Sequence, residues 1–422
     1  MSVVAATRRR VATLDRRTVA GAFFAALGAL DILGFGLGAH AGDAVFRFSV
    51  GGESAHVPDL SLPAGTTAIV LGSLSVALGA LYAGWQLGRT ARRVVIAAVM
   101  ALFILALLCW VDAGNSPLNI VGLLQSSLTR SIPLVLGAMS GLLGERAAVI
   151  NIAIEGQLLI GAFAAAVAAS AAGMLWLGLI SGSLAGGLIG VLLAVFAIRY
   201  LVDQIVLGVV LNVFVLGLTG YLYDRALVPY QTTLNSPGVY GTIRVPGLAD
   251  IPIIGPIFFD SNVFLYITYA VLLLVQVGVF HTRWGLRVRA VGEHPVAAET
   301  VGIRVIYTRY RQLVLGGLIA GIGGAYLTIG SVGAFGKGMS SGQGYIALAA
   351  MIFGRWTPFG AVGAALLFGF ASALQNILSI LGAPIPSDIL LMTPYLVVIL
   401  VVAGLVGRVR MPAADGKPYI KS

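Results

Sequence analysis

Long apolar runs dominate this sequence and constrain its fold more than any other feature. A helix needs about 20 mostly apolar residues to cross a bilayer, and only helices or closed barrels satisfy their backbone hydrogen bonds in lipid. We therefore predict an all-α polytopic membrane protein with about 12 transmembrane helices. The apolar runs lie near residues 18–38, 66–87, 94–111, 119–143, 147–171, 174–198, 204–223, 262–281, 312–334, 344–354, 358–381 and 389–406.

Composition agrees with a membrane protein, because 59% of the residues are hydrophobic and 10% are charged. The net charge of +10 comes from basic clusters between the apolar runs, so the positive-inside rule explains it without nucleic acid. Counting crossings from a cytoplasmic N-terminus places most of these clusters, and the C-terminus, in the cytoplasm. We expect the run at 18–38 to be a retained helix in which Asp31 faces a neighbouring helix or lies near the interface.

One polar cluster interrupts an apolar run at Gly144–Ala162, which reads G-E-R-A-A-V-I-N-I-A-I-E-G-Q-L-L-I-G-A. On a helix, Asn151 and Glu155 share a face, so Asn151 is a candidate hydrogen-bond partner of Glu155. An ionisable residue within a span is a candidate functional residue by default. The alternative is a structural polar lock between helices.

A similar string returns at Ser341–Gly354, where Gly342 and Gln343 repeat the Gly156 and Gln157 pair. The predicted topology runs the two strings in opposite directions, as an inverted repeat does, and such interrupted segments indicate a binding site near the midplane. The candidate residues of the substrate path are Asn151, Glu155, Gln157, Asn212, Gln343, Tyr345 and Asn376.

The arginine-rich stretch from His281 to Gln312 is longer than a tight turn requires. Pro295 is a plausible helix start, residues 296–301 are expected to form a short helix, and Gly302 is expected to end it. Such a helix can dock on a cytoplasmic partner. A basic loop resting on anionic lipid is the alternative.

These three segments resemble the permease subunits of bacterial ABC importers for nucleosides and simple sugars, within the branched-chain amino-acid and ribose permease family. The resemblance covers about residues 118–408 and includes A-V-G-E-H-P-V-A-A-E-T-V-G-I-R and G-R-W-T-P-F-G-A-V-G-A-A-L-L-F-G. It divides the chain into an extension at 1–117, a permease core at 118–408 and a cytoplasmic tail at 409–422. The extension is expected to contain three transmembrane helices and an outer hairpin near 44–60. Two positions depart from the family pattern, with His294 in place of Asn and Ala148 in place of Gly.

The resemblance implies a type II-like permease in the bacterial cytoplasmic membrane that works with a cytoplasmic ATPase and an extracytoplasmic substrate-binding protein. It also implies a second related permease, with a heterodimer favoured over a homodimer. The residues expected to couple the chain to the ATPase are Gly292, Glu293, His294, Pro295, Ala297, Ala298 and Gly302. We expect no cofactor or metal in this chain, with ATP and Mg²⁺ bound by the partner.

The leading functional prediction is the permease subunit of an ATP-driven nucleoside importer, with a simple-sugar importer as the alternative. A secondary transporter in which Glu155 binds the coupling ion is a second rival. An enzyme is disfavoured, because the chain has no H-E-x-x-H pattern and Gly336 and Lys337 precede glycine where a phosphate-binding loop needs Ser or Thr.

Overall fold

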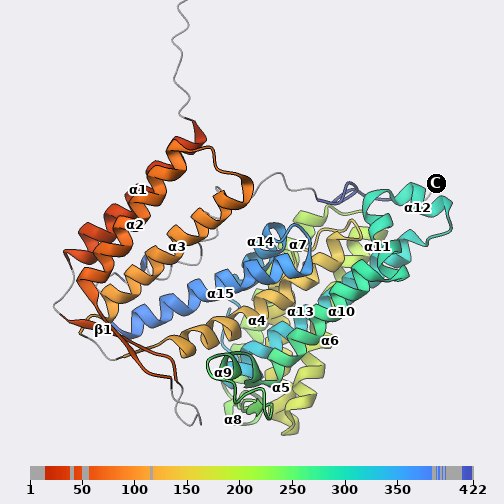
Figure 1. Ribbon diagram of the computed structural model, residues 1–422. Coiled ribbons are helices and arrows are strands. Elements are labelled where there is room, and N and C mark those ends of the chain that lie inside the picture. Colours follow the sequence, from red (N-terminus) through yellow and green to blue (C-terminus); the bar gives the residue numbers. More distant parts are fainter. Residues whose placement is uncertain are drawn as a thin grey trace, which may run out of the picture. The chain divides into compact units, whose positions relative to one another are not determined.

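The computed structural model describes residues 15–38, 42–49, 57–114, 117–382, 386, 388–389, 392, 395 and 411–420 (Figure 1). The chain forms two compact units, which are described separately. The first comprises residues 1–121 with 378–384, and the second comprises residues 122–377 with 385–422.

Ten helices within the described residues are long and apolar enough to cross a membrane, which confirms the predicted all-α polytopic class. Each coincides with one of the predicted apolar runs. The run at 344–354 forms only a short helix, Gln343–Phe353, and the run at 389–406 lies almost entirely outside the described residues. The ten spans are Arg17–Gly36, Ala64–Gly84, Thr90–Asp112, Ile120–Glu145, Ile154–Ala172, Leu175–Arg199, Gln204–Leu227, Val263–His281, Val305–Val332 and Pro358–Ile380.

The first unit is a helical bundle with a small sheet. Its elements are α1 (Arg16–Leu30), η1 (Asp31–Gly36), β1 (Asp43–Arg47), β2 (Leu60–Pro63), α2 (Ala64–Gly84), α3 (Arg89–Asp112) and β3 (Leu118–Asn119). Strand β1 pairs antiparallel with β2 and parallel with β3. The paired strands lie at 43–47 and 60–63, near the hairpin that was predicted from residues 44–60.

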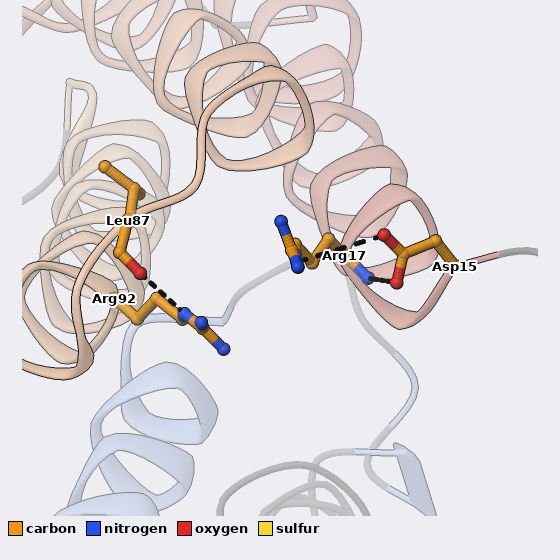
Figure 2. Close-up of polar contacts among 4 residues, drawn as sticks. All are labelled: Asp15, Arg17, Leu87 and Arg92. Carbon is orange, nitrogen blue, oxygen red and sulfur yellow. Dashed lines mark hydrogen bonds and ion pairs between the residues drawn. The ribbon is translucent and has the colours of Figure 1, made fainter.

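Local polar contacts define the helix ends of this unit. The Asp15 carboxylate accepts a hydrogen bond from the Arg17 backbone N–H at 3.4 Å, so it caps the first turn of α1 (Figure 2). In the first turn of α3, the Arg92 guanidinium donates to the carbonyl of Leu87, which precedes the helix, at 3.0 Å. Asp31 is fully buried against α2, where a Cβ added to Gly72 would lie 2.8 Å from the Asp31 Cβ.

The second unit is the larger one, and it contains all the residues predicted to form the substrate path. Its elements are α4 (Ile120–Glu145), α5 (Ile154–Ala172), α6 (Leu175–Ala194), η2 (Val195–Arg199), α7 (Gln204–Leu222), η3 (Tyr223–Leu227), α8 (Gln231–Leu234), β4 (Thr242–Arg244), α9 (Ile254–Phe259), β5 (Asp260–Asn262), α10 (Val263–His281), α11 (Arg283–Glu293), α12 (Pro295–Thr300), α13 (Val305–Ala325), η4 (Tyr326–Val332), α14 (Gln343–Phe353) and α15 (Pro358–Ile380).

Glycines hold α5, α6 and α13 in close backbone contact. Every fourth residue of α6 from Gly178 to Gly190 is glycine. A Cβ on Gly186 would lie 2.4 Å from the Gly317 carbonyl oxygen of α13, and one on Gly321 would lie 2.3 Å from the Gly182 oxygen. Helices in lipid gain their packing energy from such close approach, since lipid tails are as apolar as the side chains. This packing positions α5, whose first turn carries the candidate site.

We expect Gly321→Ala to lower the stability of the folded protein by about 1–3 kcal/mol, because the added methyl group overpacks a backbone contact. Gly220→Ala is the matched control, since a Cβ at Gly220 in α7 meets no atom within 4 Å among the described residues. Thermal loss of monodisperse protein in detergent measures both variants. Equal melting of the two variants would contradict the proposed role of the contact.

Candidate functional site

The chain between α4 and α5 is not helical, which corrects one prediction. Helix α5 begins at Ile154, so Asn151 precedes it and does not share a helical face with Glu155. Ala148 in this segment has a φ of 64°, a left-handed conformation that favours glycine. Ala148 is therefore a strained residue in the segment that leads into α5.

Asn151 and Gln157 form a closed polar cluster with Ser140 of α4. The Asn151 amide nitrogen donates to the Gln157 Oε1 and to the Ser140 hydroxyl, both at 3.1 Å. The Gln157 amide returns a bond to the Asn151 Oδ1 at 3.4 Å. All three side chains are fully buried. Because buried amides are expensive to leave unpaired, this cluster fixes the turn against α4 and matches the structural lock considered above.

Glu155 contacts the start of α14 rather than Asn151. Its Oε1 accepts hydrogen bonds from the Ser340 hydroxyl at 2.6 Å and from the Gly342 N–H at 2.8 Å, and its Oε2 accepts from the Gly344 N–H at 2.7 Å. A carboxylate is favoured at a helix N-terminus, where unpaired N–H groups and the helix dipole concentrate positive charge. The half-buried Glu155 thus holds the first turns of α5 and α14 together.

Asn212 of α7 contacts the same place, where the first turns of α5 and α14 meet at Glu155. We call this place the Glu155 junction. Its Oδ1 accepts from the Gly156 N–H at 2.8 Å, and its amide donates to the Ile152 carbonyl at 2.9 Å and to the Tyr345 hydroxyl at 3.1 Å. Asn212 is nearly buried, whereas Tyr345 is 47% exposed. The junction therefore has a closed polar interior and an aromatic rim.

The remaining path candidates lie differently. Gln343 is half-buried at the start of α14, and its Oε1 has no hydrogen-bond partner among the described residues. Asn376 is half-buried in α15, and no hydrogen bond within the described residues joins it to the junction. Sequence reasoning missed Ser140 and Ser340. Ser340 directly precedes the S-G-Q-G string, so its position was the available signal.

The predicted short helix in the arginine-rich stretch is α12, which starts at Pro295. Gly302 follows it with a φ of 85°, a conformation suited to glycine at a helix end. Gly292 and Glu293 instead belong to the last turn of α11. His294 and Ala297 are exposed.

The exposed and buried residues of α12 separate cleanly. Val296 is 63% exposed and Val301, just after the helix, is 75% exposed, whereas Ala298 is 4% exposed and packs inside the chain. Glu293, His294, Pro295 and Val296 also line one side of a groove of about 400 Å³. This groove lies at α12, and not at the Glu155 junction.

Comparisons with known proteins give one family. The family model described as "Branched-chain amino acid transport system / permease component" matches residues 123–403, so residues 1–122 lie outside the matched region. No solved structure matches the chain.

Curated relatives include two permeases named for nucleosides. The guanosine ABC transporter permease protein NupQ of Bacillus subtilis is 40% identical over 71% of this chain and 96% of its own length. The nucleoside ABC transporter permease protein NupC of Lactococcus lactis is 38% identical over 72% of this chain and 100% of its own length. The putative glucose ABC transporter permease protein TsgC13 of Haloferax volcanii is 32% identical over 60% of this chain and 77% of its own length.

The Glu155 junction generates a stability prediction. Glu155→Gln places an amide NH₂ against a backbone N–H, so we expect a loss of about 1–3 kcal/mol from the unsatisfied donor. Asp203→Asn is the matched control, because one Asp203 oxygen accepts both hydrogen bonds at the α7 N-terminus and Asn retains that oxygen. Thermal unfolding in detergent compares them. A Glu155→Gln variant as stable as Asp203→Asn would contradict the capping role.

Proposed function

Because the chain belongs to the permease family of the branched-chain amino-acid transport system, we propose that it is the translocation subunit of an ATP-driven nucleoside importer. The observation that carries the substrate class is the match to NupQ and NupC over 96% and 100% of their lengths. The putative glucose permease TsgC13 is matched at 32% identity over 77% of its length, so simple sugars are the second candidate.

The chemistry of the junction supports a neutral, polar solute. Tyr345 stands at its accessible rim, where a phenol can exchange hydrogen bonds with hydroxyl groups and with base edges, and the buried Oε1 of Gln343 is an unpaired acceptor in the same turn of α14. The Tyr345 ring also offers a flat apolar face for a nucleobase. Asn212 donates to the Tyr345 hydroxyl, and Glu155 accepts from the Gly344 N–H next to it, so both hold Tyr345 in place. Asn151 and Gln157 fix the turn that precedes α5.

The junction also supplies a physical basis for alternating access. Helix α14 has 11 residues, so it is too short to span a bilayer, and Glu155 joins its N-terminus to that of α5. A displacement of α14 must therefore move the Glu155 contacts and the rim together. The partner ATPase drives this displacement through α12, because Val296 of α12 and Val301 just after it form an exposed apolar surface on which a partner can dock.

The proposed assembly contains a cytoplasmic ATPase, an extracytoplasmic binding protein and a second related permease. A heterodimer of permeases is favoured over a homodimer. The chain lies in the bacterial cytoplasmic membrane with both termini in the cytoplasm. This orientation puts most of its basic clusters on the cytoplasmic side, as the positive-inside rule requires.

The central test is uptake by the reconstituted complex in proteoliposomes. We expect labelled guanosine to accumulate only when ATP is present on the ATPase side, and excess unlabelled glucose to leave the rate unchanged. Vesicles with the ATPase omitted are the control. Guanosine accumulation driven by a proton or sodium gradient in those control vesicles would instead establish a secondary transporter.

A second test concerns docking. Val301→Asp places a charge in the exposed apolar surface beside α12, so we expect ATPase retention on affinity-purified permease to fall about tenfold. Val239→Asp, an equivalent change at an exposed valine outside the α11–α12 segment, is the control. Unchanged retention of the ATPase on Val301→Asp would refute docking at this surface.

A further inference from the structure

The segment Met411–Ile420 is bound to the proposed ATPase-docking elements by backbone hydrogen bonds. The Ala414 N–H donates to the Gly292 carbonyl at 3.0 Å, and the Ala413 N–H donates to the Glu293 Oε2 at 3.2 Å. This segment, which we name the C-terminal segment, also supplies the second side of the groove at α12. The last turn of α11 is therefore held by residues more than a hundred positions away in the chain.

Tyr419 anchors the C-terminal segment to α12 and α13. Its side chain is 8% exposed and packs in one apolar cluster with Val291, Ala298 and Val305. The Tyr419 hydroxyl donates a hydrogen bond to the Glu299 carboxylate of α12. On the α13 side, the Arg309 guanidinium lies 5.6 Å from the centre of the Tyr419 ring and donates to the Lys417 carbonyl at 3.2 Å.

The middle of the C-terminal segment contacts the end of α4. The Asp415 carboxyl group lies beside the carboxyl group of Glu145, the last residue of α4. Gly416 has a φ of 71°, and a Cβ there would lie 2.8 Å from the Ile150 Cδ1. The segment is thus seated beside the turn that leads into α5.

Glu145 connects this contact to α14. The Trp356 indole N–H donates to the Glu145 Oε2 at 2.5 Å, and the Arg146 guanidinium donates to the Trp356 carbonyl. Trp356 lies three residues after the end of α14, whose first turn is bound by Glu155. A continuous series of contacts therefore runs from Glu299 of α12 to the Glu155 junction.

We propose that the C-terminal segment is a mechanical link that transmits movement of α12 to α4 and α14, with Tyr419 and Asp415 as its positioning residues. The proposal rests on the function proposed above and adds an element of this chain to the coupling machinery. Without the segment, the contacts described for α12 to the rest of the chain are mainly its neighbours α11 and α13. With it, α12 is also tied to the end of α4 and to Ile150 in the turn that follows.

The carboxyl contact has a definite chemical requirement. A hydrogen bond between two carboxyl groups needs one of them to hold a proton. Burial raises the pKa of Asp415 to about 6, while the contact with Glu145 and the nearby Arg309 act in the opposite direction. An asparagine at residue 415 can accept from a protonated Glu145 or donate to an ionised one, so it preserves the contact, whereas alanine removes it.

The test uses the complete complex in proteoliposomes and measures guanosine molecules transported per ATP hydrolysed, normalised to assembled complex. We expect Tyr419→Phe, which keeps the ring and loses only the bond to Glu299, to lower this ratio about fivefold. We expect Asp415→Ala to lower it similarly and Asp415→Asn to restore it. Met411→Ala, at a residue of the same segment that is 62% exposed and does not line the groove, is the matched control and should retain the wild-type ratio.

Several outcomes separate this proposal from the proposed function. Wild-type ratios in both Tyr419→Phe and Asp415→Ala would overturn the link and leave the importer intact. A low ratio in Asp415→Asn as well as in Asp415→Ala would also overturn it, because the contact would then not be the determinant. A wild-type complex that transports without ATP would instead overturn the proposed function.

Discussion

The contact between Glu155 and the start of α14 is the interaction on which the organisation of the larger unit depends. A single carboxylate satisfies two backbone N–H groups and one hydroxyl, and it does so where two helices begin within an apolar environment. Those donors would otherwise lack partners, and a bare carboxylate would be costly there. The Glu155 carboxylate and the N-terminus of α14 therefore stabilise each other.

The glycine contacts among α5, α6 and α13 make that arrangement possible. They bring backbones together so closely that the position of α5 is fixed by its neighbours along most of its length. Its first turn then presents Glu155 and the Gly156 N–H at a defined place, where Asn212 and the first turn of α14 meet them. The glycine contacts thus set the position of Glu155 relative to Asn212 and α14.

The sequence predicted the spans well because their signal is local: an apolar run of about 20 residues has few other uses. It also predicted α12, since Pro295 and Gly302 mark helix ends through their own backbone preferences. It failed at Asn151, because a helical spacing argument assumes the helix, and the chain is irregular there. The partners of Glu155 lie 185 to 189 residues away, so no local pattern indicated them.

Helix α14 is bounded by residues in an uncommon backbone conformation. Ser341 before it has a φ of 46°, and Arg355 and Trp356 after it have φ values of 55° and 53°. For residues with a side chain, this region costs roughly 1 kcal/mol or more per residue, which the surrounding contacts must offset. Helix α14 therefore begins and ends at strained backbone. Breaking the contacts at either end would release this torsional strain and favour a change in the orientation of α14.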